Sequence, residues 1–193
     1  QRADLSDPGS ADLLRGNLHN VSAVIHAAAH LGADPVRHAD DTLRGTATVL
    51  EALRGTDIRL VLVSSIAVYD TGALHPGDTL TETSPLEAPD TARDAYTQAK
   101  LRQELLCSDA GHQTWLMRAG AVYGPGRSWH ALLGFWVSKL HVQINSDGQL
   151  PLVHVTHLAQ ALVAATQTEP LGVQALNILD DDLPTRARFL AAH

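Results

Sequence analysis

Three residues in this chain have the types and spacing needed to move a proton on and off an oxygen atom. Tyr96 and Lys100 are four residues apart, so on a helix their side chains lie on one face, about one turn apart. Ser65 ends an apolar run that is typical of a buried strand, and a side chain at a strand's end can face such a helix. The sequence therefore predicts a proton-transfer site.

The chemistry of the three side chains explains why they belong together. A tyrosine hydroxyl, with a pKa of about 10, is a poor base at neutral pH unless a cation such as Lys100 stabilises the phenolate. Tyr96 can then take a proton from a substrate alcohol or return one to a carbonyl, while the Ser65 hydroxyl orients the same oxygen. The reaction also needs a hydride acceptor, which no side chain provides, so NAD or NADP is expected.

The elements that must position these residues alternate between strand and helix patterns. A Tyr-Lys pair by itself is more simply interpreted as a surface tyrosine that packs over the lysine side chain. The strands and helices around the pair reverse that interpretation. Five apolar runs are typical of buried strands: 22–29, 58–63, 114–118, 152–155 and 174–179. Helical spacing is found in 35–53, 96–110 and 157–166. We therefore expect an α/β fold, a Rossmann-like doubly wound parallel sheet that binds ligands at the carboxyl ends of its strands.

Composition limits the kind of protein. The 193 residues are 45% hydrophobic, enough for one sizeable core. The formal net charge of -7 argues against nucleic acid or an anionic membrane as a partner, and no apolar run approaches the roughly 20 residues that cross a bilayer. A soluble, cytoplasmic protein with a small-molecule substrate is expected. Cys107, the single cysteine, excludes an internal disulfide.

Ordered motifs run through nearly the whole chain. They are Asp4-Leu-Ser-Asp7, Val24-Ile-His-Ala-Ala-Ala29, Arg44-Gly-Thr46, Leu62-Val-Ser-Ser-Ile-Ala-Val-Tyr69, Tyr96-x-x-x-Lys100, Leu116-Met-Arg-Ala-Gly-Ala-Val-Tyr-Gly-Pro-Gly126 and Pro151-Leu-Val-His-Val155. In this order they resemble the extended short-chain dehydrogenase/reductases, and within them most closely the NAD-dependent epimerase/dehydratase family.

The resemblance implies a role for each matching position. Tyr96 would be the general base or acid, Lys100 would lower its pKa and hold the nicotinamide ribose, and Ser65 would bind the reacting oxygen. Ser65, Tyr96 and Ala121 would face the substrate. The other residues expected around the cofactor are Asp4 and Leu5 at the adenine, the small residues Ala27, Ala28 and Ala29, Val63 in the same groove, and Ala119, Gly120 and Val122 over the nicotinamide.

Three positions depart from the family's pattern. Thr42 stands where an Asn usually precedes x-Arg-Gly-Thr, so the chain lacks the residue that would contribute a helix distortion or a proton relay at this position in the family. Ala121 stands where many sugar-nucleotide members carry an Asn, which weakens the substrate assignment. His157 replaces a common acidic residue at a helix start, although Thr156 is expected to cap that helix.

The family's first strand, its glycine-rich G-x-x-G-x-x-G turn and its second strand are expected before Gln1. The residues from Gly120 to Gly126 are interpreted as a turn after the strand 114–118, and Gly124-Pro-Gly126 within it is not interpreted as a phosphate-binding turn. The chain is therefore expected to be a fragment that binds cofactor poorly alone. Residues 1–123 would form a partial NAD(P)-binding Rossmann-like domain, and 124–193 a mixed region with substrate-binding elements among the last strands and helices.

A metal site is not expected. His154 and His157 are three residues apart, but they span a predicted strand-to-helix junction, and zinc requires three or four convergent ligands. The run Asp180-Asp-Asp182 is interpreted as a solvated acidic turn.

Three functions remain open at this point. The first is a nucleotide-sugar epimerase or reductase; a dehydratase usually has an acidic residue where this chain has Ile66-Ala67. The second is a dehydrogenase or reductase for a sterol-like or other hydrophobic alcohol. The third is a non-catalytic cofactor-binding protein, against which the intact Ser65, Tyr96 and Lys100 argue. A homodimer is also open, because relatives often dimerise through helices that include the tyrosine helix.

Overall fold

The computed structural model divides the chain into two compact units. The first comprises residues 1–118 and 162–177, and the second comprises residues 119–161 and 178–193. Each unit takes residues from both sides of residue 123. The domain division predicted there stays a prediction. The structure describes residues 3–75, 77–127, 135–137, 140–142 and 148–192.

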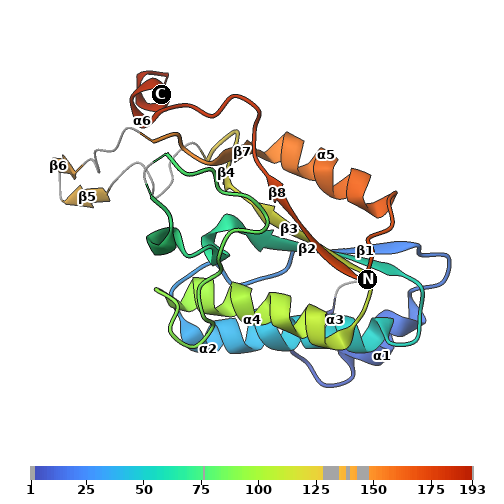
Figure 1. The fold of residues 1–193 in the computed structure, drawn as a ribbon. Helices are drawn as coiled ribbons and strands as arrows, with labels where there is room; N and C mark the ends of the chain where they lie inside the picture. Colours follow the sequence, from blue (N-terminus) through green and yellow to red (C-terminus); the bar gives the residue numbers. More distant parts are fainter. Residues whose placement is uncertain (1–2, 76, 128–134, 138–139, 143–147, 193) are drawn as a thin grey trace. The chain divides into compact units, whose positions relative to one another are not determined.

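A four-stranded sheet with the order β1-β2-β3-β8 organises the first unit (Figure 1). Its strands are β1 (Ala23–His26), β2 (Arg59–Ser65), β3 (Thr114–Ala119) and β8 (Val173–Ile178). Strands β1 and β2 are parallel, with Ile25 opposite Val61. Helices α3 (Gly45–Leu53) and α4 (Ala95–Ala110) lie side by side against one face of this sheet, and α1 (Ser10–Gly16) packs on α3. The predicted Rossmann-like α/β fold is confirmed.

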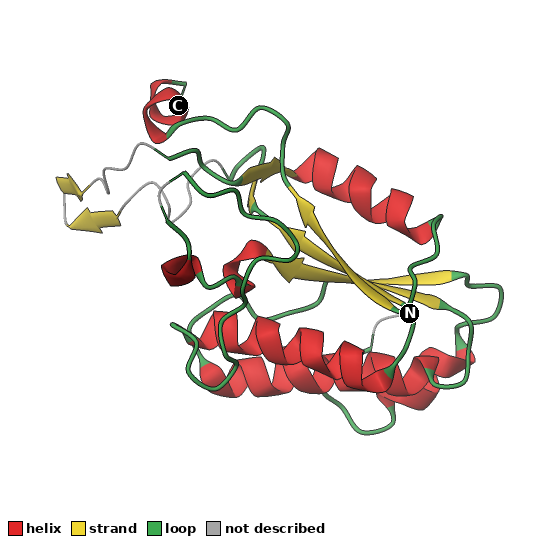
Figure 2. Ribbon diagram, viewed as in Figure 1, coloured by secondary structure: helices red, strands yellow, loops and turns green. Residues whose placement is uncertain are grey.

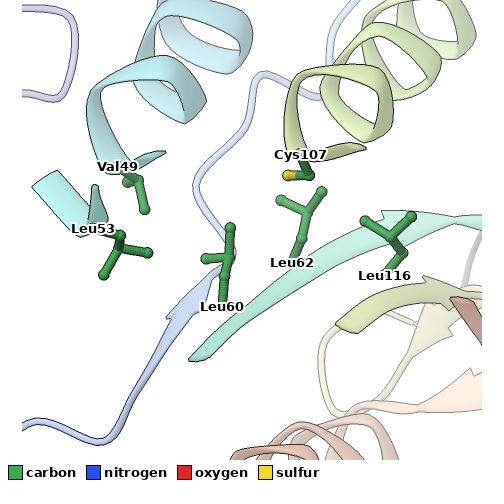
Figure 3. Close-up of a cluster of buried hydrophobic side chains, with 6 residues drawn as sticks. All are labelled: Val49, Leu53, Leu60, Leu62, Cys107 and Leu116. Atoms are coloured by element: carbon green, nitrogen blue, oxygen red, sulfur yellow. The ribbon is translucent and has the colours of Figure 1, made fainter. Parts of the chain in front are cut away.

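The core of the first unit is apolar and joins both helices to the sheet. It contains a cluster of six buried side chains, those of Val49, Leu53, Leu60, Leu62, Cys107 and Leu116 (Figure 3). They come from α3, β2, α4 and β3, so each of these elements contributes its apolar face to one cluster. Cys107 is fully buried there.

The predicted helix over 35–53 forms, but with a distorted middle. It consists of α2 (Pro35–Arg37), the π-helical segment η1 (His38–Arg44) and α3. The Asp34 side chain caps its start by accepting from the backbone N–H groups of Val36 and Arg37. The distortion includes Thr42, so it persists in this chain without the Asn that the family usually has there.

Helix α4 has clear signals at both ends. The Asp94 carboxylate accepts from the Thr97 N–H at 2.7 Å, and Gly111 ends the helix with a left-handed φ of 59°. The short 3-10 segments η2 (Ile66–Val68) and η3 (Thr71–Ala73) lie between β2 and this helix, and a loop joins η3 to the helix (Figure 2). The capping fixes where α4 begins and therefore where Tyr96 lies.

The second unit contains strand β4 (Ala121–Tyr123), paired in parallel with β7 (Leu152–His154), and an antiparallel pair, β5 (Phe135–Val137) with β6 (Leu140–Val142). Its remaining elements are α6 (Arg186–Ala191) and the first part of α5 (Val155–Thr166).

Two local predictions in the second unit are wrong. The residues interpreted as a turn at 120–126 include a strand, because the Ala121 N–H donates to the Pro151 carbonyl and extends the chain. Helix α5 begins at Val155, so Thr156 lies inside it. The His154 Nδ1 instead accepts from the Thr156 N–H at 3.3 Å.

Gly120 is expected to tolerate no side chain. A Cβ at this position would lie 2.5 Å from the Pro151 carbonyl oxygen and 2.6 Å from Leu179 Cδ2. Gly120→Ala should therefore destabilise the protein by about 1–3 kcal/mol, measured by chemical denaturation. Gly16→Ala is the control, because a Cβ there meets nothing within 4 Å. Equal stability of the two variants would contradict this packing.

Candidate active site

Lys100 is the best-defined group of the predicted site. The residue is only 4% exposed, and its Nζ donates to the Val63 backbone carbonyl and to Gln103 Oε1, both at 2.9 Å. Burial lowers the pKa of Lys100 to about 8, although the nearby charge of Glu104 raises it. Strongly perturbed groups of this kind concentrate at functional sites.

Ser65 lies at the strand end to which Lys100 is bonded. It is the last residue of β2, two residues after Val63. Its Oγ accepts from the Ala67 N–H at 3.2 Å, which starts η2. A hydroxyl that accepts in this way still has its own proton to donate, so Ser65 can hydrogen-bond a substrate oxygen.

Tyr96 lies in the first turn of α4, one turn before Lys100 and on the same helix face. Its side chain is partly buried. The centre of its ring is 6.2 Å from that of His38, which comes from the π-helical segment η1 and is 3% exposed. The distorted helix thus places the His38 ring beside that of Tyr96. No sequence motif predicted this neighbour.

Four of the residues predicted to hold the cofactor line one pocket in the first unit. The complete lining is Ala3, Asp4, Leu5, Ser6, Ala28, Ala29 and Asp41. Of the same predicted set, Ala27 is exposed outside this lining, and Val63 contributes its carbonyl to Lys100.

Helix α3 holds the chain at this pocket. Thr48 Oγ1 donates to the Leu5 carbonyl at 2.8 Å, and a Cβ on Gly45 would lie 3.3 Å from Leu5 Cβ. The Asp4 carboxylate accepts from the side chain and backbone N–H of Ser6, which lowers the pKa of Asp4. The pocket is therefore formed by a fixed stretch of backbone with an ionised side chain.

A buried set of hydrogen-bonded side chains continues from Lys100, and the sequence did not predict it. Gln103 Nε2 donates to Thr46 Oγ1 at 2.7 Å, and Thr46 Oγ1 is 3.0 Å from His26 Nε2. Burial, together with the charge of Lys100, lowers the pKa of His26 to about 4, so this imidazole is neutral at pH 7. The available signal was the spacing of Gln103, three residues after Lys100 on the helix.

A buried ion pair lies one turn further along α4. Arg118 donates to both carboxylate oxygens of Glu104, at 3.0 and 2.7 Å, and their side chains are 6% and 7% exposed. Ser64 Oγ also donates to Glu104, at 2.5 Å, and Arg118 donates to the Tyr69 hydroxyl, at 2.9 Å. Tyr69 in turn donates to Asn177 Oδ1. This network fastens α4 to β2, β3 and β8.

The remaining predicted site residues, Ala119, Gly120, Ala121 and Val122, belong to the second unit. Ala119 ends β3, and the other three run from the following glycine into β4. Their roles over the nicotinamide and against the substrate stay predictions.

Asp180 is held by its neighbours in the second unit, which corrects its interpretation as part of a solvated turn. Its carboxylate lies 2.8 Å from His157 Nδ1 and accepts from the His154 N–H and from the Tyr123 hydroxyl. Burial works against ionisation, but these hydrogen bonds outweigh it and lower the pKa of Asp180.

Among the residues that the structure describes, no three His, Cys, Asp or Glu side chains gather as metal ligands would. In this part of the chain no helix has the length and apolarity needed to cross a membrane.

The fold defines a class of protein: a Rossmann-like α/β chain, in which one strand carries Ser65 and one helix carries Tyr96 and Lys100. Within that class, residues 1–178 match the model of the NAD dependent epimerase/dehydratase family, and the chain belongs to this family.

A curated relative is the 3-diazoavenalumate denitrifying reductase of a Streptomyces species. It is 30% identical over 152 residues, which are 76% of this chain and 49% of the relative. The chain therefore spans about half the length of this reductase.

Solved structures share the fold at lower identity. MoeE5 in complex with UDP-glucose and NAD has a TM-score of 0.70 and 20% identity, over 99% of this chain and 66% of that one. The UDP-glucose 4-epimerase of Thermus thermophilus, in complex with NAD, gives 0.70 and 23% over the same shares. RMD of Pseudomonas aeruginosa, complexed with NADPH, gives 0.74 and 21%, over 97% of this chain and 69% of that one.

Proposed function

We propose that the intact protein interconverts an alcohol and a carbonyl by NAD(P)-dependent hydride transfer, acting on a nucleotide sugar as an epimerase or reductase. One observation carries the proposal. The ammonium of Lys100 is buried one helical turn from Tyr96 and is bonded to the strand end where Ser65 lies. A purely structural lysine does not need such a costly position.

Each of the three side chains has a distinct task. The positive charge of Lys100 stabilises the phenolate form of Tyr96, which then takes the hydroxyl proton of the substrate. The Ser65 hydroxyl donates to the same oxygen as it becomes a carbonyl. In the reverse direction Tyr96 returns the proton to the oxygen.

The described residues fit a nicotinamide dinucleotide in part. The pocket at Asp4, Leu5, Ala28 and Ala29 offers small side chains at a strand's carboxyl end, as an adenosine moiety requires. Lys100 would hold the nicotinamide ribose by an N–H donor. When bound, this cofactor supplies or accepts the hydride. The glycine-rich phosphate turn is not found in the 193 residues, so tight binding is expected only in the intact protein.

A second candidate is a reductase for a substrate that is not a sugar. The curated relative is named as a reductase of 3-diazoavenalumate, and Ala121 replaces the Asn that many sugar-nucleotide members carry. Without that amide the position favours a less polar ligand.

The two candidates are separated by one substrate panel on the intact protein. With NAD or NADP present, UDP-, dTDP- and GDP-sugars should give an epimerised or reduced product. Chromatography detects the product, and absorbance measures the reduced cofactor. Hydrophobic alcohols and ketones form the second arm. Turnover confined to that arm would replace the first candidate by the second, and cofactor binding without any turnover would overturn both.

A further inference from the structure

The side-chain amide of Gln103 has a fixed orientation between two groups with opposite needs. Lys100 Nζ is only a donor, so the amide oxygen faces it, at 2.9 Å. On the other side Gln103 Nε2 is 2.7 Å from Thr46 Oγ1. The single hydroxyl proton of Thr46 is already donated to the Thr42 carbonyl, at 2.7 Å. Thr46 therefore accepts from Gln103, and a flipped amide would lose both bonds.

The same accounting fixes the tautomer of His26. Because Thr46 has no second proton to give, the ring nitrogen Nε2 of His26, 3.0 Å away, must carry a hydrogen and donate to Thr46 Oγ1. A neutral His26 therefore has its proton on Nε2. The hydrogen bonds run from His26 to Thr46, from Gln103 to Thr46, and from Lys100 to Gln103.

The four hydrogen-bonded residues, His26, Thr46, Gln103 and Lys100, are each 4% exposed or less, so water does not replace a lost partner. In the described part of the protein the Lys100 ammonium donates to two acceptors, the Val63 carbonyl and Gln103. An ammonium has three N–H donors, so these two bonds fix the direction of the third.

We propose that Gln103 is a positioning residue for Lys100. Its amide ties the ammonium to Thr46 and His26, holds it in the charged form, and leaves one N–H directed at a ligand. The proposal rests on the proposed function, in which Lys100 acts beside the reacting hydroxyl. Other ionisable groups near Lys100 are Tyr96, one turn earlier on the same helix, Glu104, one turn later and paired with Arg118 of β3, and His26 of β1. Gln103 is the neutral side chain that bonds the ammonium directly, alongside the backbone carbonyl of Val63.

The test is the pKa of Lys100 in the intact protein, measured by NMR with lysine-selective isotope labelling and assigned through Lys100→Arg. The 193 residues contain one other lysine, Lys139, so this part of the protein contributes two lysine signals. Gln103→Met keeps the shape of the side chain but removes its acceptor. It should lower the pKa of Lys100 by about one unit or more. Gln103→Glu should raise it by a similar amount, because a carboxylate favours the ammonium.

Gln98→Met is the matched control. Gln98 is on the same helix, but its amide donates to the Ala92 carbonyl and should leave the pKa of Lys100 unchanged. For a substrate that is turned over, the alkaline limb of the kcat profile should move with the pKa. An unchanged Lys100 pKa in both Gln103 variants would overturn the proposal. Shifted pKa values with no turnover on any substrate would instead overturn the proposed function alone.

Discussion

Tyr96→Phe is expected to reduce turnover by the intact protein about 10²- to 10⁴-fold, while NAD(P) binding and stability stay close to those of the wild type. The change removes only the hydroxyl, which in the proposed mechanism is the group that gives and takes the substrate proton. The ring remains to pack beside His38. The measurements are kcat on the best substrate of the panel, the cofactor dissociation constant and a denaturation curve.

Thr97→Val controls for disturbance of the helix start. Thr97 is the next residue of α4 and is fully buried, and its Oγ1 has no hydrogen-bond partner among the described residues. Replacing this hydroxyl by a methyl group should leave turnover unchanged. If Tyr96→Phe kept wild-type kcat, the tyrosine would not be the acid or base, and the proposed mechanism would be wrong.

Breaking the buried ion pair should produce the largest loss of stability. Arg118→Met is expected to lower the free energy of unfolding by about 3–5 kcal/mol, because it leaves the Glu104 carboxylate buried without its charged partner. Burial works against the charge of Arg118, but hydrogen bonds and the charge of Glu104 outweigh it and raise the pKa of the guanidinium. Urea denaturation of the variant measures the effect.

Two further variants show whether the loss comes from an uncompensated charge. Glu104→Leu combined with Arg118→Met removes both charges and should recover a large part of the lost stability. Arg102→Met breaks an exposed pair with Asp90 and should change stability by about 0.5 kcal/mol or less. An Arg118→Met variant as stable as Arg102→Met would show that the buried pair does not hold the helix.

The sequence predicted those parts of the site that depend on local spacing. Tyr96 and Lys100 share a helix face because a helix repeats every 3.6 residues, and Asp94 marks where that helix begins. The strand before Ser65 was evident from its apolar run, and its observed end at Ser65 agrees with the expectation.

The partners that hold these residues depend on contacts between distant elements, and local spacing does not reveal them. Gln103 and Thr46 are 57 positions apart in the chain. Glu104 and Arg118 lie on different elements, and each is a residue type that is usually solvated. The strand at Ala121 was missed for a related reason, because its extended conformation comes from pairing with Leu152 rather than from its own residues.

Helix α4 presents Tyr96, Lys100 and Glu104 at successive turns, from a partly buried first turn to a buried ion pair. The proposed chemistry therefore lies in the first two turns of α4, and the anchoring ion pair lies in the middle of the helix, about two turns after Tyr96. For protein engineering this is a useful separation. The loop before Ala95 is open to exchange in a search for new substrates, provided that the ion pair of Glu104 and Arg118 is left as it is.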